Sequence, residues 1–144
     1  MKSAAPDIAK ARAEHDEILV LLGRLETALA EPSPPAGLDR IRREAAVKVR
    51  SHLAHEDWTI YPWLLSSESD VIVETARRLF AESADFAGAL AAHLARWPAE
   101  RAAADWDNYR AAAQPLIKRL RLRTKAENEE LYRLLLEERS GEAA

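Results

Sequence analysis

Apolar residues recur every three or four positions along four segments of the chain, which are separated by stretches rich in proline, serine and acidic residues. This spacing is that of amphipathic helices, and no segment alternates as a strand would. The pattern predicts an all-α fold with helices over about residues 7–30, 38–65, 70–97 and 105–138. Short connections favour an antiparallel up-down-up-down four-helix bundle, which we expect to form one domain over residues 1–144.

Prolines and turn residues set the expected helix boundaries. The stretch EPSPPAG at 31–37 ends the first helix, and SSESD at 66–70 supplies a turn and a cap for the third. Pro62 predicts a bend in the second helix, because proline lacks the amide for a helical hydrogen bond. The fourth helix has two possible starts: near Asp105 with a bend at Pro115, or at Pro115 itself.

Polar residues interrupt the apolar stripe of every predicted helix. His15 and His52 lie at nearly equal distances from the turn between their helices, so we expect them at one depth in the bundle. Counting from the other interhelical turns places Ser83 and Arg123 at the same depth. Glu56 and Glu127 then lie about one helical turn away along their helices. An isolated carboxylate in an apolar core costs several kcal/mol, so these groups must be paired, hydrogen-bonded or bound to a metal.

The second and fourth helices carry a faint repeat that contains the two acids. In the first copy, Glu56 follows His52 by four residues and Tyr61 follows Glu56 by five. In the second copy, Glu127 and Tyr132 follow Arg123 at the same spacing. The spacing of four places two side chains on one helix face, about 6 Å apart along the axis. We interpret the tyrosines as core side chains. The chain has no cysteine, so a metal here would rest on nitrogen and oxygen ligands.

Three motifs resemble the hemerythrin-like (HHE cation-binding) family: EHDEI at 14–18, HLAHEDWTIYP at 52–62 and RTKAENEELY at 123–132. The resemblance implies a four-helix bundle that usually holds two non-haem irons and binds O2, or senses oxygen, nitric oxide or redox state. By position, the residues that match the family's metal ligands are His15, His52, Glu56 and Glu127.

Two positions depart from the family's pattern. Ser83 and Arg123 stand where the third and fourth helices of the family carry histidines. Arginine does not ligate metals at ordinary pH, and its fixed charge opposes a nearby cation. The sequence therefore predicts a reduced site, with one iron or a weakly held pair, for O2, NO or peroxide.

A metal-free bundle is the alternative. In it, the Arg123 guanidinium replaces the missing cation and links Glu127 to Glu56 through its planar fork, and the protein acts as a regulatory or protein-interaction module. A third possibility is an enzyme that activates O2 at the metal. The sequence shows no substrate pocket and no general base beyond the ligands, so an enzymatic role is not favoured.

The remaining histidines are not expected to ligate the same metal, and the composition favours neither nucleic-acid binding nor a membrane location. His55 is expected to make a surface or interhelical hydrogen bond, and His93 lies about 15 Å past Ser83 along the axis, too far to share a metal. With 21 basic and 24 acidic residues and no separate basic block, nothing favours nucleic-acid binding. No segment approaches the ~18 apolar residues of a membrane span and no signal peptide is recognisable, so we expect a cytoplasmic protein.

Overall fold

The computed structural model describes residues 5–143, and the elements in that range are all helical. Two of them, η1 and η2, are π-helical turns that directly continue an α-helix. The elements in chain order are α1 (Ile8–Leu29), α2 (Leu38–His55), η1 (Glu56–Ile60), α3 (Tyr61–Leu65), α4 (Asp70–Glu82), α5 (Phe86–Arg96), α6 (Ala99–Ala104), α7 (Trp106–Ala126), η2 (Glu127–Tyr132) and α8 (Arg133–Ala143).

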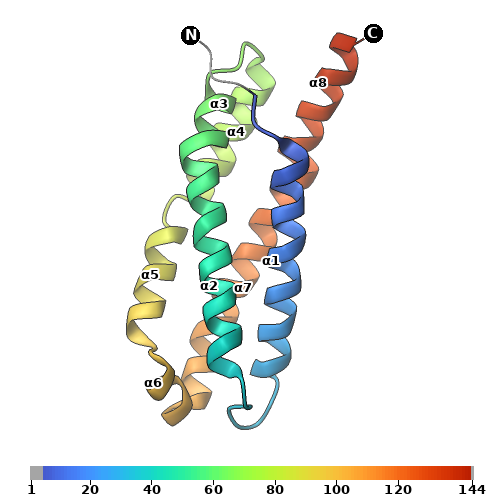
Figure 1. The fold of residues 1–144 in the computed structure, drawn as a ribbon. Coiled ribbons are helices and arrows are strands. Elements are labelled where there is room, and N and C mark those ends of the chain that lie inside the picture. The colour runs from blue at the N-terminus through green and yellow to red at the C-terminus, as the bar shows by residue number, and fades with distance from the viewer. Residues whose placement is uncertain (1–4, 144) are drawn as a thin grey trace.

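These elements form four antiparallel columns, as Figure 1 shows: α1, then α2 with η1 and α3, then α4 with α5, then α7 with η2 and α8. The first column contacts the second and the fourth, since α1 lies against α2 and α7. The third column closes the bundle, because α4 contacts α3 and η2 while α5 contacts α7. The all-α up-down-up-down bundle predicted from the sequence is confirmed.

Local sequence explains where several helices begin. The carboxylate of Asp7 accepts a hydrogen bond from the Lys10 N–H at 3.0 Å, which caps the first turn of α1. Ser69 caps α4 through the N–H of Ile72 in the same way. Gly37 precedes α2 with a φ of 83°, a left-handed conformation that glycine adopts without steric cost.

The third column is broken where the sequence predicted one continuous helix over 70–97. It ends once at Glu82 and restarts at Phe86, and the Ser83 hydroxyl donates to the Leu79 carbonyl at 2.9 Å across the last turn of α4. A serine that bonds its own backbone competes with helical continuation. The short helix α6, which joins the third and fourth columns, was also not predicted.

Both prolines are accommodated within their columns. Pro115 lies inside α7, which begins at Trp106, so the earlier of the two predicted starts is correct. Pro62 follows a π-helical turn in which the Tyr61 N–H donates to the Glu56 carbonyl, five residues back. The irregularity predicted near Pro62 therefore takes the form of a wider turn that begins at Glu56.

The core consists of two apolar clusters stacked along the bundle axis. One holds Ile18, Leu22 and Leu53 with the buried faces of α5 and α7. The other holds Ile8 and Ile60 with the buried faces of α3, α4 and η2. The buried polar side chains come from positions between these clusters along their helices: His15, His52, Glu56, Thr124 and Glu127. A polar layer thus separates two apolar halves.

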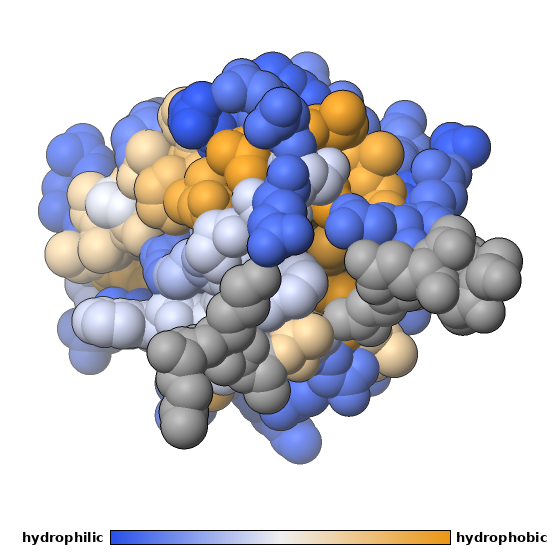
Figure 2. Space-filling view, turned by 90° about the horizontal axis from the view of Figure 1, so that it is seen from above, coloured by the Kyte–Doolittle hydropathy of each residue, from blue (hydrophilic) through white to orange (hydrophobic). Residues whose placement is uncertain are grey.

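Figure 1 shows α3, α4 and α8 at one end of the bundle, and each of these helices carries an exposed apolar side chain. Leu65, Val71 and Leu136 are 39%, 60% and 41% exposed. Viewed from this end, orange apolar surface lies among blue polar side chains (Figure 2). Within residues 5–143, no helix is both long and apolar enough to cross a membrane. The cytoplasmic location expected from the sequence stays a prediction.

We predict that Ile18→Ala lowers the free energy of unfolding by about 2–5 kcal/mol, because it leaves a cavity in a core that cannot fully collapse. Ile18 is fully buried, whereas Val20 on the same helix is 57% exposed. Val20→Ala is therefore the matched control, with an expected change within about 0.5 kcal/mol. Denaturant titration monitored by circular dichroism measures both, and equal losses for the two variants would contradict the assigned packing.

Candidate metal centre

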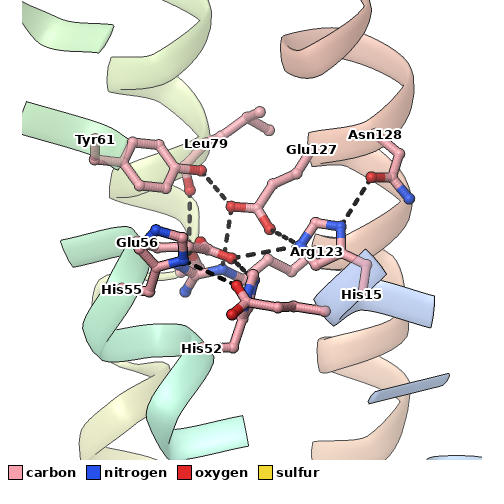
Figure 3. A network of polar contacts seen from close by, with 11 residues as sticks. His15, His52, His55, Glu56, Tyr61, Leu79, Arg123, Glu127 and Asn128 are labelled. Carbon is pink, nitrogen blue, oxygen red and sulfur yellow. Dashed lines mark hydrogen bonds and ion pairs between the residues drawn. The ribbon is translucent and has the colours of Figure 1, made fainter. Parts of the chain in front are cut away.

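Four side chains from three columns meet in the polar layer: His15 from α1, His52 from α2, Glu56 from η1 and Glu127 from η2. One nitrogen or oxygen atom from each lies within 4.8 Å of the others. None of these residues is more than 2% exposed. Figure 3 shows the side chains pointing toward one another from separate helices. The four residues singled out in the sequence therefore share one depth inside the bundle.

The two histidines direct Nε2 at the carboxylates. His15 Nε2 lies 3.2 Å from Glu127 Oε1 and 3.5 Å from Glu56 Oε1. His52 Nε2 contacts Glu56 Oε1 closely and is likewise buried. The donor atoms of the four residues thus converge on one point, which is the arrangement that a bound cation requires.

The opposite ring nitrogens are held by oxygen acceptors. His15 Nδ1 donates to Asn128 Oδ1 at 2.8 Å, and His52 Nδ1 donates to Glu14 Oε1 at 3.0 Å. A proton held on Nδ1 leaves the Nε2 lone pair of a neutral imidazole free, which is how metal-binding histidines are commonly oriented. Sequence reasoning missed Glu14 and Asn128. The available signal was that each directly adjoins a candidate ligand, His15 or Glu127.

Each carboxylate divides its two oxygens between two cationic neighbours. Oε1 of both Glu56 and Glu127 faces the histidines. Glu56 Oε2 accepts a hydrogen bond from Arg123 Nη2 at 2.7 Å, and Glu127 Oε2 lies 3.7 Å from Arg123 Nε. The carboxylate pair therefore bridges two positions for positive charge. One is lined by imidazole nitrogens, and the Arg123 guanidinium fills the other.

The chain matches the family model "Hemerythrin HHE cation binding domain" over residues 6–135. That match covers most of the chain, including all four clustered residues. The chain belongs to the hemerythrin HHE cation-binding family. No curated protein and no solved structure gives a significant match. The hemerythrin-like fold expected from the three sequence motifs is thus confirmed at the level of the family.

Burial and mutual repulsion give the carboxyl groups of Glu56 and Glu127 different pKa values. Burial and the negative charge of Glu56 raise the pKa of Glu127 to about 7. Burial opposes ionisation of Glu56 too, but hydrogen bonds from Glu127 and the histidines, with the charge of Arg123, hold its pKa well below the usual range. Two carboxyl groups this close cannot both ionise freely without a compensating cation.

The same carboxylates hold protons on the histidines when no metal is bound. Burial opposes a charged ring, but hydrogen bonds to Glu127 and Glu56 outweigh it and raise the pKa of His15 to about 10. The pKa of His52 is also raised, since contacts with Glu56 and Glu14 overcome its burial. A metal ion would displace these protons and supply the positive charge in their place.

The π-helical turns bring two tyrosines to the centre. A turn closed by i→i+5 hydrogen bonds holds one more residue than an α-turn, so the residue five positions after each glutamate moves toward that glutamate's face. Tyr61 consequently donates to Glu127 Oε2 at 2.7 Å across the bundle. The Tyr132 ring stacks on His15 with ring centroids 5.4 Å apart, and its buried hydroxyl has no hydrogen-bond partner among the described residues. Both tyrosines were predicted as core side chains, and the Tyr61 hydrogen bond was not predicted.

Three other predicted residues lie outside the cluster. Ser83, placed in the same cross-section by counting along the sequence, bonds its own helix instead, because the third column breaks there. His55 makes the expected interhelical hydrogen bond, to Glu14 Oε1 at 2.9 Å. His93 is remote and stacks on Tyr109, with ring centroids 5.8 Å apart.

The donor set fits one divalent cation. Two imidazole nitrogens and two carboxylate oxygens suit iron, manganese or zinc, and one such atom from each of the four residues lies within 4.8 Å of the others. The residues that would hold the ion are His15, His52, Glu56 and Glu127. A second cation would have to share the carboxylates with the Arg123 guanidinium, whose charge opposes it.

We predict that Arg123→Ala lowers the free energy of unfolding of the metal-free protein by about 3–5 kcal/mol at pH 8, where both buried carboxyl groups are ionised and lose their permanent cation. Arg119→Ala is the control on the same helix. Arg119 pairs with Asp85 at 2.7 Å near the surface, so its loss should cost no more than about 1 kcal/mol. Urea unfolding after chelator treatment measures both, and an equally small effect at Arg123 would show that the carboxylates do not depend on it.

Proposed function

We propose that this hemerythrin-like chain holds a single non-haem iron ion through His15, His52, Glu56 and Glu127, and that the ion binds or senses a small oxidant or gas. The observation that carries the proposal is the division of the carboxylate oxygens. Oε1 of each faces the histidines, while Oε2 faces Arg123. On this reading Arg123 takes the place of a second metal ion.

The charge of the cluster supports one ion rather than two. Two ionised carboxylates and one guanidinium leave a net charge of minus one around neutral histidines. One divalent ion changes this to plus one, whereas two ions would give plus three in a fully buried layer. Uncompensated buried charge costs several kcal/mol, so the second ion is strongly disfavoured.

Burial limits the ligand to a small molecule. The four side chains are at most 2% exposed, so nothing larger than a few atoms reaches them without opening the bundle. A cavity of about 210 Å³ at the break in the third column is lined by Ser83, Phe86, Arg123 and neighbouring residues, and it offers an approach from the Arg123 side. O2, NO and peroxide fit these limits, and bound iron would supply an open coordination position for them.

The metal-free alternative also has an observation in its favour. Arg123 contacts both Glu56 and Glu127, so the guanidinium by itself already links the two acids. In that case the bundle would serve as a regulatory or protein-interaction module, with protonated histidines in the place of the metal. Iron binding distinguishes this alternative from the single-iron proposal.

We predict that the protein, loaded anaerobically with Fe(II) and desalted, retains about one iron per chain, and that His52→Ala loses at least about nine-tenths of it. His52 supplies one of the four proposed ligand atoms, and the alanine side chain has none. His93→Ala is the matched control because His93 lies in the other half of the bundle, and it should retain the full amount. Elemental analysis gives the stoichiometry, and absorption spectra before and after NO addition report on the open position. Iron content that is negligible in the unmutated protein would favour the metal-free module.

We also predict that Arg123→His raises the iron content toward two per chain. The substitution removes the fixed charge and adds an imidazole beside Oε2 of both carboxylates. Arg123→Gln is the control, since it removes the charge while adding a poor metal ligand, and it should stay near one. If Arg123→His also remains at one iron, the guanidinium does not occupy a second cation position.

A further inference from the structure

A second group of ligand atoms lies on the outer side of His52, between α1 and α2. Glu14 Oε1 is 3.0 Å from His52 Nδ1 and 2.9 Å from His55 Nδ1. His52 and His55 are three residues apart on α2 and so project from one helix face toward α1, where Glu14 meets them. One ligand atom from each of the three residues lies within 4.8 Å of the others.

We propose that Glu14, His52 and His55 form a second cation site, here called the outer site, for a divalent ion of the zinc class. Two imidazole nitrogens and one carboxylate oxygen are the ligand types that zinc prefers, and three protein ligands leave a fourth position for water. Solvent reaches the outer site, because the side chains of Glu14 and His55 are 16% and 22% exposed. The four residues of the buried metal centre are at most 2% exposed.

The contacts at the outer site bring two ring nitrogens to a single carboxylate oxygen. Both ring N–H groups share one oxygen, Glu14 Oε1. A cation that replaces the two Nδ1 protons would bind both ring nitrogens and the Glu14 oxygen at once. The three residues also come from two helices, so the ion would link α1 to α2 beside the buried centre.

His52 belongs to both groups of ligands, and this couples the two sites. A neutral imidazole has one lone pair, so His52 can give it to an ion at Nε2 in the centre or to an ion at Nδ1 in the outer site. An outer ion therefore competes with the inner one for His52. The outer site itself stands on Glu14, His52 and His55, whereas the competition rests on the proposed inner iron.

Zinc titration of chains with a weakened inner centre tests the outer site. Glu127→Gln removes an inner ligand and leaves all three outer residues unchanged. We expect this variant to bind about one Zn²⁺ in competition with a chromophoric chelator, and a further His55→Ala change to weaken that affinity at least tenfold. A further His93→Ala change is the control and should leave the affinity unchanged. An equal zinc affinity with and without His55 overturns the proposal.

Histidine-ring ¹⁵N spectra of the unmutated chain give a test that does not depend on how a variant folds. The chain has only four histidines. Zinc should move the Nδ1 resonance of His55 to the position of a metal-bound nitrogen, with the His93 resonances as an internal reference. A His55 signal that does not respond to saturating zinc overturns the outer site.

The competition has its own measurement. The part of the zinc affinity that depends on His55, taken as the difference from the His55→Ala variant, should fall at least tenfold when iron is present, and an unchanged value overturns the sharing of His52. If no iron binds under any condition, the proposed function fails, while the zinc titration and the His55 spectrum still decide the outer site.

Discussion

Two carboxylates buried in contact with each other set the terms for the rest of this structure. Glu56 and Glu127 are almost fully shielded from water, and each would be costly to ionise alone. The side chains that contact them supply positive charge or a proton: Arg123 and Tyr61 on the Oε2 side, and the imidazoles on the Oε1 side. The polar layer of the bundle is thus an arrangement of cations and donors around one pair of acids.

The helices are shaped to deliver those groups. Both π-helical turns begin at an acid of the pair, and both bring forward a tyrosine five residues later. The extra residue in each turn lets Tyr61 reach Glu127 across the bundle and lets Tyr132 lie against His15. Wider turns of this kind are often found at functional sites. Apolar clusters above and below hold the layer, so it has little freedom to rearrange.

Membership of the hemerythrin HHE cation-binding family places this centre in a known context, and Arg123 gives it a distinctive charge. A guanidinium is a cation that cannot be removed by a chelator or by oxidation. On our proposal, the guanidinium permanently fills one of the two cation positions beside the carboxylates, and an exchangeable metal ion fills the other. Glu14 then extends the arrangement outward, since it holds His52 from behind and joins it to His55 near the surface.

The sequence by itself determined the all-α bundle, and it brought together the four residues of the centre, because helical periodicity fixes which side chains face inward and short turns fix their depth. It did not reveal the break at Ser83, since a local serine-to-backbone hydrogen bond overrides an otherwise continuous pattern. It also missed Glu14, Asn128 and the reach of Tyr61. Those contacts depend on the rotation of each helix about its axis and on the π-helical turns. Both are determined by the packing between columns. Metal ligation stays a prediction for all four residues of the centre: His15, His52, Glu56 and Glu127. The division of the carboxylate oxygens between the imidazoles and Arg123 was decided by the tertiary structure alone, because it requires atoms from three helices to converge.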